Sequence, residues 1–272
     1  MKTIFIIPYR DRLEHLYFFK QYAPFVLNNS TIYEVYFVHQ KDDRPFNRGA
    51  MKNVGFIAMK HKYPDTYRDM TFIFNDIDIL PYTKGIFDYS TRHGVIKHYY
   101  GYENSLGGSF AIKGGDFEKI NGFPNIWSYG LEDSLINDRA IKGKLKIDRS
   151  QFHRIGAKEV LQLFDGINRL VDKNDNKTII EQYYTDGHST IINNNNASNL
   201  RYSIHTDTPC ETENGDHSRN TPASFFMIDV HNFKTGISEA NTVLFIDSIM
   251  NIRERGSQNA RRQPSRARVG LM

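Results

Sequence analysis

The chain has 272 residues, one cysteine, 24% charged and 39% hydrophobic content, which allows one large domain or two small ones. These values exclude a collagen-like chain, a disulfide scaffold and a mainly disordered protein. The net charge is +4, but residues 253–272 hold six arginines and one glutamate, a charge of +5, so residues 1–252 carry −1. Because the basicity belongs to the C-terminal end, we expect no nucleic-acid partner for the body of the protein.

Targeting signals are not evident in the sequence. No segment approaches 18 consecutive apolar residues, so we expect no membrane span. The apolar run at residues 4–7 is too short for the core of a signal peptide. Cys210 is the only cysteine and has no partner for an internal disulfide, which favours a reducing compartment. Together these features predict a cytoplasmic protein.

The first half of the chain alternates between strand and helix patterns. Strands are predicted over residues 3–8, 32–38 and 70–74, and helices over residues 11–26 and 47–60, with Asp11 available to cap the first helix. This order predicts an α/β fold with a mostly parallel sheet and right-handed crossovers. Ligands of such sheets bind beyond the carboxyl ends of the strands, so the residues after the first and third strands are candidates for a site.

The second half is less regular. Strands are predicted over residues 107–113 and 224–230, and a helix over residues 132–141 that opens on two acids. Residues 193–196 are four asparagines and predict a loop. From residue 251 onward Arg, Ser, Gln, Asn, Gly and Pro dominate, which predicts a disordered tail. We therefore expect a single catalytic or binding domain over residues 1–250 and a basic tail over residues 251–272.

Two acidic pairs and three arginines are candidates for chemistry. Asp76 and Asp78 follow an apolar strand, where two carboxylates could bind a divalent cation that also contacts phosphate, or could form an exposed turn. Glu132 and Asp133 open a predicted helix, which is ordinary for helix N-termini, although Asp133 could act as a general base. Arginines beside the same sheet edge could bind a diphosphate or could be surface charges; they are Arg10, Arg12 and Arg48.

Several short blocks in a fixed order resemble the β-1,4-galactosyltransferase family, glycosyltransferase family 7. The resemblance runs from residue 4 to about residue 142 and continues more weakly to about residue 232. The blocks are residues 6–12, Phe46-Asn47-Arg48, Asn53-Val54-Gly55-Phe56, Asp76-Ile77-Asp78, Gly107-Gly108, residues 121–125 and residues 127–133.

The resemblance implies a GT-A fold and an inverting, metal-dependent transfer of a sugar from a UDP-sugar donor, with Mn²⁺ as the cofactor. Asp133 matches the family's catalytic base, and Asp78 matches a Mn²⁺ ligand. Tyr129, Glu132 and Ser134 fall at acceptor-side positions. The positions that match donor binding are Pro8, Tyr9, Arg10, Arg12, Phe46, Arg48, Asp76, Ser105, Gly107 and Gly108.

Three departures from the family pattern bear on substrates. Ser134 stands where the family has a third acid, so an acceptor contact is in doubt. Tyr129 replaces the usual tryptophan and offers less stacking area. Ser105 stands where galactose-transferring relatives have tyrosine, and its small side chain leaves room for an N-acetyl group on the donor sugar. We therefore expect UDP-GalNAc to be used at least as well as UDP-Gal.

The remaining metal ligands are hard to place. Relatives supply a histidine about 30 residues after the Glu-Asp pair, and here that region, residues 160–165, contains no histidine. Asp165 is the first candidate because its oxygen ligands suit Mn²⁺, and His153 is the alternative.

The sequence thus predicts a galactose or N-acetylgalactosamine transferase that acts on a hydroxyl of a sugar or glycoconjugate acceptor. Two alternatives remain open. The chain could be a catalytically weak or inactive family member that binds a nucleotide sugar or a glycan. A nucleic-acid binder is suggested by the tail alone, which lacks interleaved aromatic residues.

Overall fold

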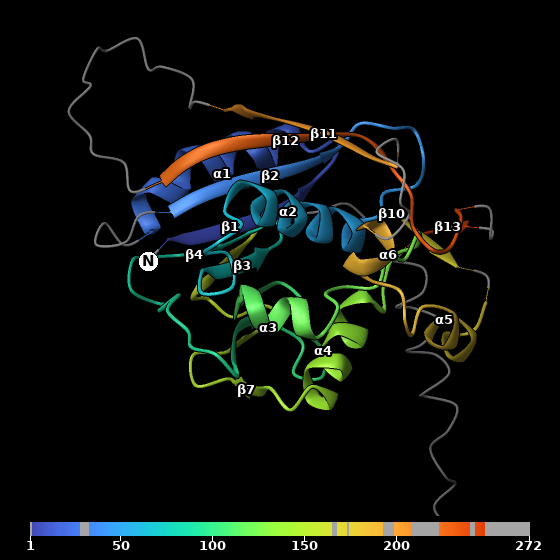
Figure 1. Cartoon of the computed structure of the whole chain (residues 1–272). Coiled ribbons are helices and arrows are strands. Elements are labelled where there is room, and N and C mark those ends of the chain that lie inside the picture. The colour runs from blue at the N-terminus through green and yellow to red at the C-terminus, as the bar shows by residue number, and fades with distance from the viewer. Residues whose placement is uncertain are drawn as a thin grey trace, which may run out of the picture.

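A nine-stranded sheet runs through the protein in the computed structural model (Figure 1). The structure describes residues 2–27, 33–164, 168–172, 174–192, 199–207, 223–239 and 243–247. The strands follow the order β11-β12-β2-β1-β3-β6-β5-β7, and β8 pairs with β5. Among the described residues, no helix combines the length and apolar character needed to cross a membrane.

The centre of the sheet is parallel, as the sequence predicts. β1 (Thr3–Tyr9) pairs in parallel with both β2 (Tyr33–Gln40) and β3 (Thr71–Asn75). The crossovers contain α1 (Leu13–Val26) and α2 (Arg48–Lys62). All seven residues of β1 and all five of β3 are buried, which explains their continuous apolar runs. These strands end at the same edge of the sheet.

Both flanks of the sheet include antiparallel strands. β6 (Ser109–Lys113) is antiparallel to β3 and to β5 (Val95–Gly101), and β7 (Lys146–Asp148) and β8 (His153–Arg154) run parallel to β5. On the other flank β12 (Ala223–Phe233) is parallel to β2 and antiparallel to β11 (Leu200–Thr206). The sheet is therefore mixed and mostly parallel around β1, which confirms the predicted fold class.

Smaller elements surround the sheet. The other helices are α3 (Gly114–Lys119), α4 (Glu132–Lys142), α5 (Asn176–Gln182) and α6 (His188–Ile192). Two further strand pairs lie outside the large sheet: β4 (Ile79–Pro81) with β9 (Val160–Gln162), and β10 (Asn168–Asp172) with β13 (Val243–Asp247).

Alternation along β1 divides the core between the two faces of the sheet. Ile4 and Ile6 join a cluster with the apolar residues of α2, whereas Phe5 and Ile7 join a second cluster with those of α1. The two helices therefore cover opposite faces (Figure 1).

The predicted cap of α1 is wrong. The helix begins at Leu13, and its N-cap residue is Arg12, which makes no capping bond through its side chain. Asp11 is exposed and has a φ of 50°, a left-handed conformation in which its carboxylate contacts Arg10 Nε at 3.3 Å. The predicted asparagine loop, Cys210 and the tail over residues 251–272 lie outside the described residues.

Candidate active site

A cavity of about 310 Å³ lies beyond the carboxyl ends of β1 and β3. Its walls come from the exits of these two strands, the start of α2, the turn before β6, and the loop and first turn of α4. Of the residues predicted for the site, those that line the cavity are Pro8, Arg10, Arg12, Phe46, Arg48, Asp76, Asp78, Ser105, Gly107, Gly108, Tyr129 and Asp133.

The other predicted site residues that the structure describes are not among those lining the cavity. Tyr9 is buried and packs edge-on against His39, with ring centroids 5.0 Å apart. Glu132 is buried, and Ser134 follows Asp133 in the first turn of α4. Asp165 lies outside the described residues. His153, the alternative metal ligand, pairs with Glu159 at 3.5 Å.

The turn after β3 fixes the first acidic pair. The Asn75 side chain donates to the backbone carbonyls of Asp76 and Ile79, at 2.7 and 2.8 Å. The Asp76 backbone N–H donates to the Gly108 carbonyl at 2.9 Å, which ties this turn to the glycines before β6. The turn at residues 75–79 and the Gly107-Gly108 pair therefore form one wall of the cavity.

Gly107 packs directly against the Asp133 carboxylate. A Cβ on Gly107 would lie 2.7 Å from Asp133 Oδ2, closer than real Cβ contacts allow. The Leu106 N–H also donates to the Asp133 carbonyl at 2.9 Å. Gly108 has a φ of +70°, which favours glycine. The Gly-Gly pair thus leaves room for the Asp133 carboxylate at the cavity wall.

Two cations from α2 interact with three carboxylates. Arg48 Nη2 lies 2.7 Å from Asp76 Oδ2, and Arg48 Nη1 lies 3.6 Å from Glu132 Oε1. Lys52 Nζ lies 3.4 Å from Asp76 Oδ1 and 3.6 Å from Asp133 Oδ1. Arg48, predicted to bind a diphosphate, is therefore paired with carboxylates.

These charges and burial act differently on the two aspartates. Burial raises the pKa of Asp133 to about 7. The nearby carboxylates of Glu132 and Asp76 raise this pKa further, and the cations Lys52 and Arg48 offset the increase only in part. For Asp76 burial also acts upward, but Arg48 and Lys52 prevail and hold the pKa of its carboxyl below the ordinary value. Asp133 is consequently suited to exchange a proton near neutral pH, whereas Asp76 stays ionised.

Oxygen donors suitable for a hard divalent cation are present near Asp78. Asp78 and Gln162 line the same cavity, and the Leu163 N–H donates to the Asp78 carbonyl at 2.8 Å. Asp76 is paired with Arg48 and Lys52, and the Asp78 carboxylate supplies the oxygen ligand type that a hard divalent cation prefers. Within the described ranges no group of three or more His, Cys, Asp or Glu side chains could hold a metal. A complete coordination shell would need further ligands.

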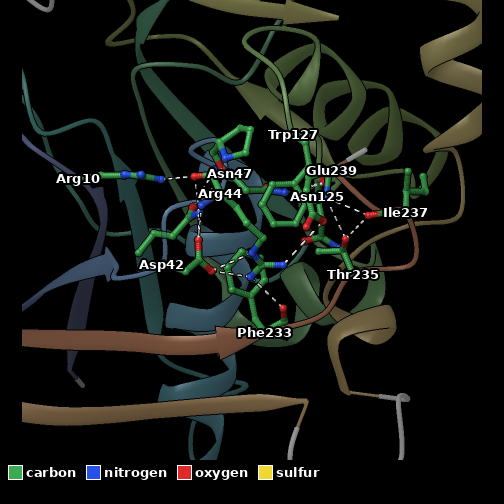
Figure 2. A network of polar contacts seen from close by, with 12 residues as sticks. Arg10, Asp42, Arg44, Asn47, Asn125, Trp127, Phe233, Thr235, Ile237 and Glu239 are labelled. Carbon is green, nitrogen blue, oxygen red and sulfur yellow. Dashed lines mark hydrogen bonds and ion pairs between the residues drawn. The ribbon is translucent and has the colours of Figure 1, made fainter. Parts of the chain in front are cut away.

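The loop at residues 127–131, called the Trp127 loop below, is anchored on one side by an arginine (Figure 2). The Arg44 guanidinium lies 4.6 Å from the Trp127 ring and 4.3 Å from the Phe233 ring. Trp127 Nε1 donates to the Ile237 carbonyl at 2.9 Å. The chain after β12 therefore holds the loop that contributes to the cavity.

Several residues that shape the site were not found from the sequence. Lys52 reads as an ordinary polar position of a helix, and only its burial shows its role. His98 holds the turn before β6, because its Nε2 lies 3.0 Å from the Tyr100 carbonyl and 3.1 Å from the Gly107 carbonyl. Arg44 joins segments nearly 190 residues apart. No local pattern in the sequence signals these three residues.

Comparison with family models gives two matches. Residues 1–87 match the N-terminal region of glycosyl transferase group 7, and residues 91–161 match the N-terminal domain of galactosyltransferase. The two matched regions do not overlap and together include more than half of the chain.

Curated relatives are β-1,4-galactosyltransferases. Xylosylprotein 4-beta-galactosyltransferase of Caenorhabditis elegans is 33% identical over 159 residues, which is 54% of this chain and 53% of the relative. Beta-1,4-galactosyltransferase 1 of Bos taurus is 31% identical over 202 residues, 62% of this chain and 49% of the relative. The chain spans about half the length of the curated relatives it matches.

A solved structure shows the same fold. A mutant of Drosophila β-1,4-galactosyltransferase 7 in complex with manganese, UDP-Gal and xylobiose aligns with a TM-score of 0.60 and 19% identity, covering 84% of this chain and 94% of that one. The likeness identifies the fold as GT-A, as the resemblance of motifs implied.

Proposed function

Since this chain belongs to the glycosyl transferase group 7 family, we propose that it transfers galactose or N-acetylgalactosamine from a UDP-sugar to a hydroxyl of a sugar or glycoconjugate, with inversion. The observation that carries the proposal is the placement of Asp78, Arg10, Arg12 and Asp133 around one cavity. These groups supply a metal ligand, cations for a diphosphate and a base. Relatives named as galactosyltransferases support the same reaction class.

In the proposed reaction the acceptor hydroxyl gives its proton to Asp133. The acceptor oxygen then bonds to the anomeric carbon of the donor sugar, and the bond from that carbon to UDP breaks with its electron pair leaving on UDP. A carboxylate with a pKa near 7 can take this proton at neutral pH. Arg10 and Arg12 line the cavity where the diphosphate would lie.

Mn²⁺ is the proposed cofactor, with Asp78 and Asp165 as its proposed protein ligands. When bound, the ion would offset the negative charge that develops on the departing diphosphate. The oxygen chemistry of Asp78 fits this ion. A structure containing manganese and UDP-Gal in a protein of the same fold supports the proposal.

Release of UDP from UDP-Gal tests the function. We expect release that depends on Mn²⁺, using xylobiose as the first acceptor probe, and a loss of at least about a hundredfold in Asp133→Asn, which removes the base. Binding of UDP-Gal should persist in this variant. Binding without turnover in the wild-type protein, over a broad acceptor screen, would instead favour a glycan-binding or nucleotide-sugar-binding member.

Donor choice is proposed to depend on Ser105. Its side chain is buried at the cavity wall, and its hydroxyl lies 3.5 Å from the Tyr102 carbonyl of its own turn. The small side chain supports use of UDP-GalNAc at least as well as UDP-Gal. Ser105→Tyr should lower turnover of UDP-GalNAc relative to UDP-Gal. A strong wild-type preference for UDP-Gal would reject this donor assignment.

A further inference from the structure

Lys52 places a charge where α2 packs against the protein interior. Its side chain is only 2% exposed, and most of its neighbours in α2 are buried apolar residues. Burying an ammonium group is costly unless opposite charges or hydrogen bonds compensate it. A lysine retained at such a position needs a specific partner.

The partners of Lys52 are two aspartates that line the cavity. Its Nζ lies 3.4 Å from Asp76 Oδ1 and 3.6 Å from Asp133 Oδ1. Neither oxygen has a hydrogen-bond partner among the described residues. The Phe123 ring lies 4.6 Å from the same ammonium group. One buried cation therefore spans the end of β3 and the first turn of α4.

The charges that face Asp133 come from three elements. Lys52 and Arg48 belong to α2, Glu132 is its neighbour in α4, and Asp76 follows β3. With all of them ionised, three carboxylates meet two cations. Arg48 is already shared between Asp76 and Glu132, so Lys52 is the cation in ion-pair contact with Asp133.

We propose that Lys52 is a positioning residue for the transfer reaction, which holds Asp133 against Asp76 and keeps Asp133 ionised as the base. The proposal rests on the proposed function of Asp133. Burial and two neighbouring carboxylates favour its protonated form, and Lys52 opposes them. Without Lys52, less of the protein would have a base ready to accept a proton at neutral pH.

The pH profile of Lys52→Met separates this role from a structural one. With Mn²⁺, UDP-Gal and xylobiose, we expect the acidic limb of kcat/KM to move upward by about one pH unit, which lowers kcat/KM near pH 6 about tenfold. Near pH 9, where Asp133 is ionised in both proteins, the difference should largely vanish. A uniform loss at every pH would overturn the proposal.

Lys113→Met is the matched control. Lys113 is also buried, but its Nζ donates to the Asp69 carbonyl and to Thr71 Oγ1, at the opposite end of β3 from Asp76. Its loss should leave the pH profile in place. Lys52→Gln serves as a second neutral variant if Lys52→Met does not fold, and the same shift is expected of it.

A carboxyl titration by ¹³C NMR tests the proposal without turnover. The signal of Asp133, assigned by its absence in Asp133→Asn, should titrate at higher pH in Lys52→Met than in the wild-type protein. An unchanged titration would overturn the role of Lys52. If the wild-type protein binds UDP-Gal but releases no UDP, the proposed function fails, and the titration still decides whether Lys52 controls Asp133.

Discussion

At the scale of single residues, the role proposed for Asp133 as a base comes with a cost to stability. Its carboxyl would titrate near 3.8 in the unfolded chain and near 7 in the folded protein. The folded protein therefore holds a proton between these values that the unfolded chain releases, so its stability falls as the pH rises from about 4 to about 7. A base suited to neutral pH is thus obtained at the expense of stability.

Asp133→Asn should for this reason be more stable than the wild-type protein at pH 8. The gain should shrink toward pH 4, where the carboxyl is protonated in the folded protein and resembles an amide. Urea unfolding at pH 8, 6 and 4 measures the difference. A gain in stability of equal size at all three pH values would contradict the raised pKa.

At the scale of elements, the Trp127 loop depends on contacts with segments that precede and follow it in the chain. The Tyr129 N–H donates to the Leu170 carbonyl at 2.6 Å, and Arg44 lies against the Trp127 ring. Helix α4 then begins after Leu131, whose φ of 68° is unusual for a residue with a side chain. The loop is therefore held in a defined conformation by residues outside it.

Arg44→Leu should loosen this loop. A cation–π contact contributes about 1 kcal/mol, so we expect the KM for UDP-Gal to rise by about fivefold while the fold is retained. Trp127 is the only tryptophan, so its fluorescence reports on this loop directly. Acrylamide should quench it more in the variant.

Lys62→Met provides the matched comparison, because Lys62 makes its own aromatic contact with Phe226 at 4.8 Å, away from the loop. Its removal should change neither the quenching nor the KM. Equal quenching in Arg44→Leu and the wild-type protein would show that Arg44 does not hold the loop.

The elements predictable from the sequence are those whose burial is continuous or periodic. β1 and β3 follow from apolar runs, and Arg10, Arg12, Asp76 and Asp78 follow because parallel strands place their carboxyl ends at one edge. The resemblance to the family, and no local pattern, predicted Ser105, Gly107, Gly108 and Tyr129 at the site. β5 was missed because His98 and Lys97 interrupt its apolar pattern. Lys52 was missed because a lysine within a helix ordinarily indicates an exposed face, and tertiary contacts decide otherwise here.

At the scale of the whole molecule, packing of helices on the sheet tolerates little change. A Cβ on Gly55 of α2 would lie 2.6 Å from Ile6 Cγ2 and 2.9 Å from Val38 Cγ2. A Cβ on Gly49 would meet the Pro124 carbonyl oxygen at 2.0 Å. Asn53 also donates to the Phe123 carbonyl at 2.7 Å. These close approaches bring α2, with Arg48 and Lys52, against both β1 and the segment before α4.

Acid stability of the whole molecule should depend on a buried histidine. His98 is 1% exposed, and burial, with Arg149 nearby, lowers its pKa from 6.5 to about 4. Its Nε2 faces two carbonyls, and its Nδ1 accepts from Arg149 Nε at 3.2 Å, an arrangement that requires the neutral ring. Between about pH 4 and pH 6.5, this histidine binds a proton in the unfolded chain but not in the folded protein. Stability from this group is therefore complete above about pH 6.5 and falls as the pH drops to about 4.

His98→Gln should flatten this acid dependence, because glutamine does not titrate and can still donate to a carbonyl. Between pH 7 and pH 4 the wild-type protein should lose about 3 kcal/mol more unfolding free energy than the variant. Urea unfolding at a series of pH values measures the loss. Burial also lowers the pKa of His188, so the stability of both proteins falls with pH to the same extent through that residue. The difference in stability between the two proteins therefore reports on His98. Parallel stability curves would show that folding does not lower the pKa of His98, and the neutral ring would then not be needed to hold the turn at Gly107.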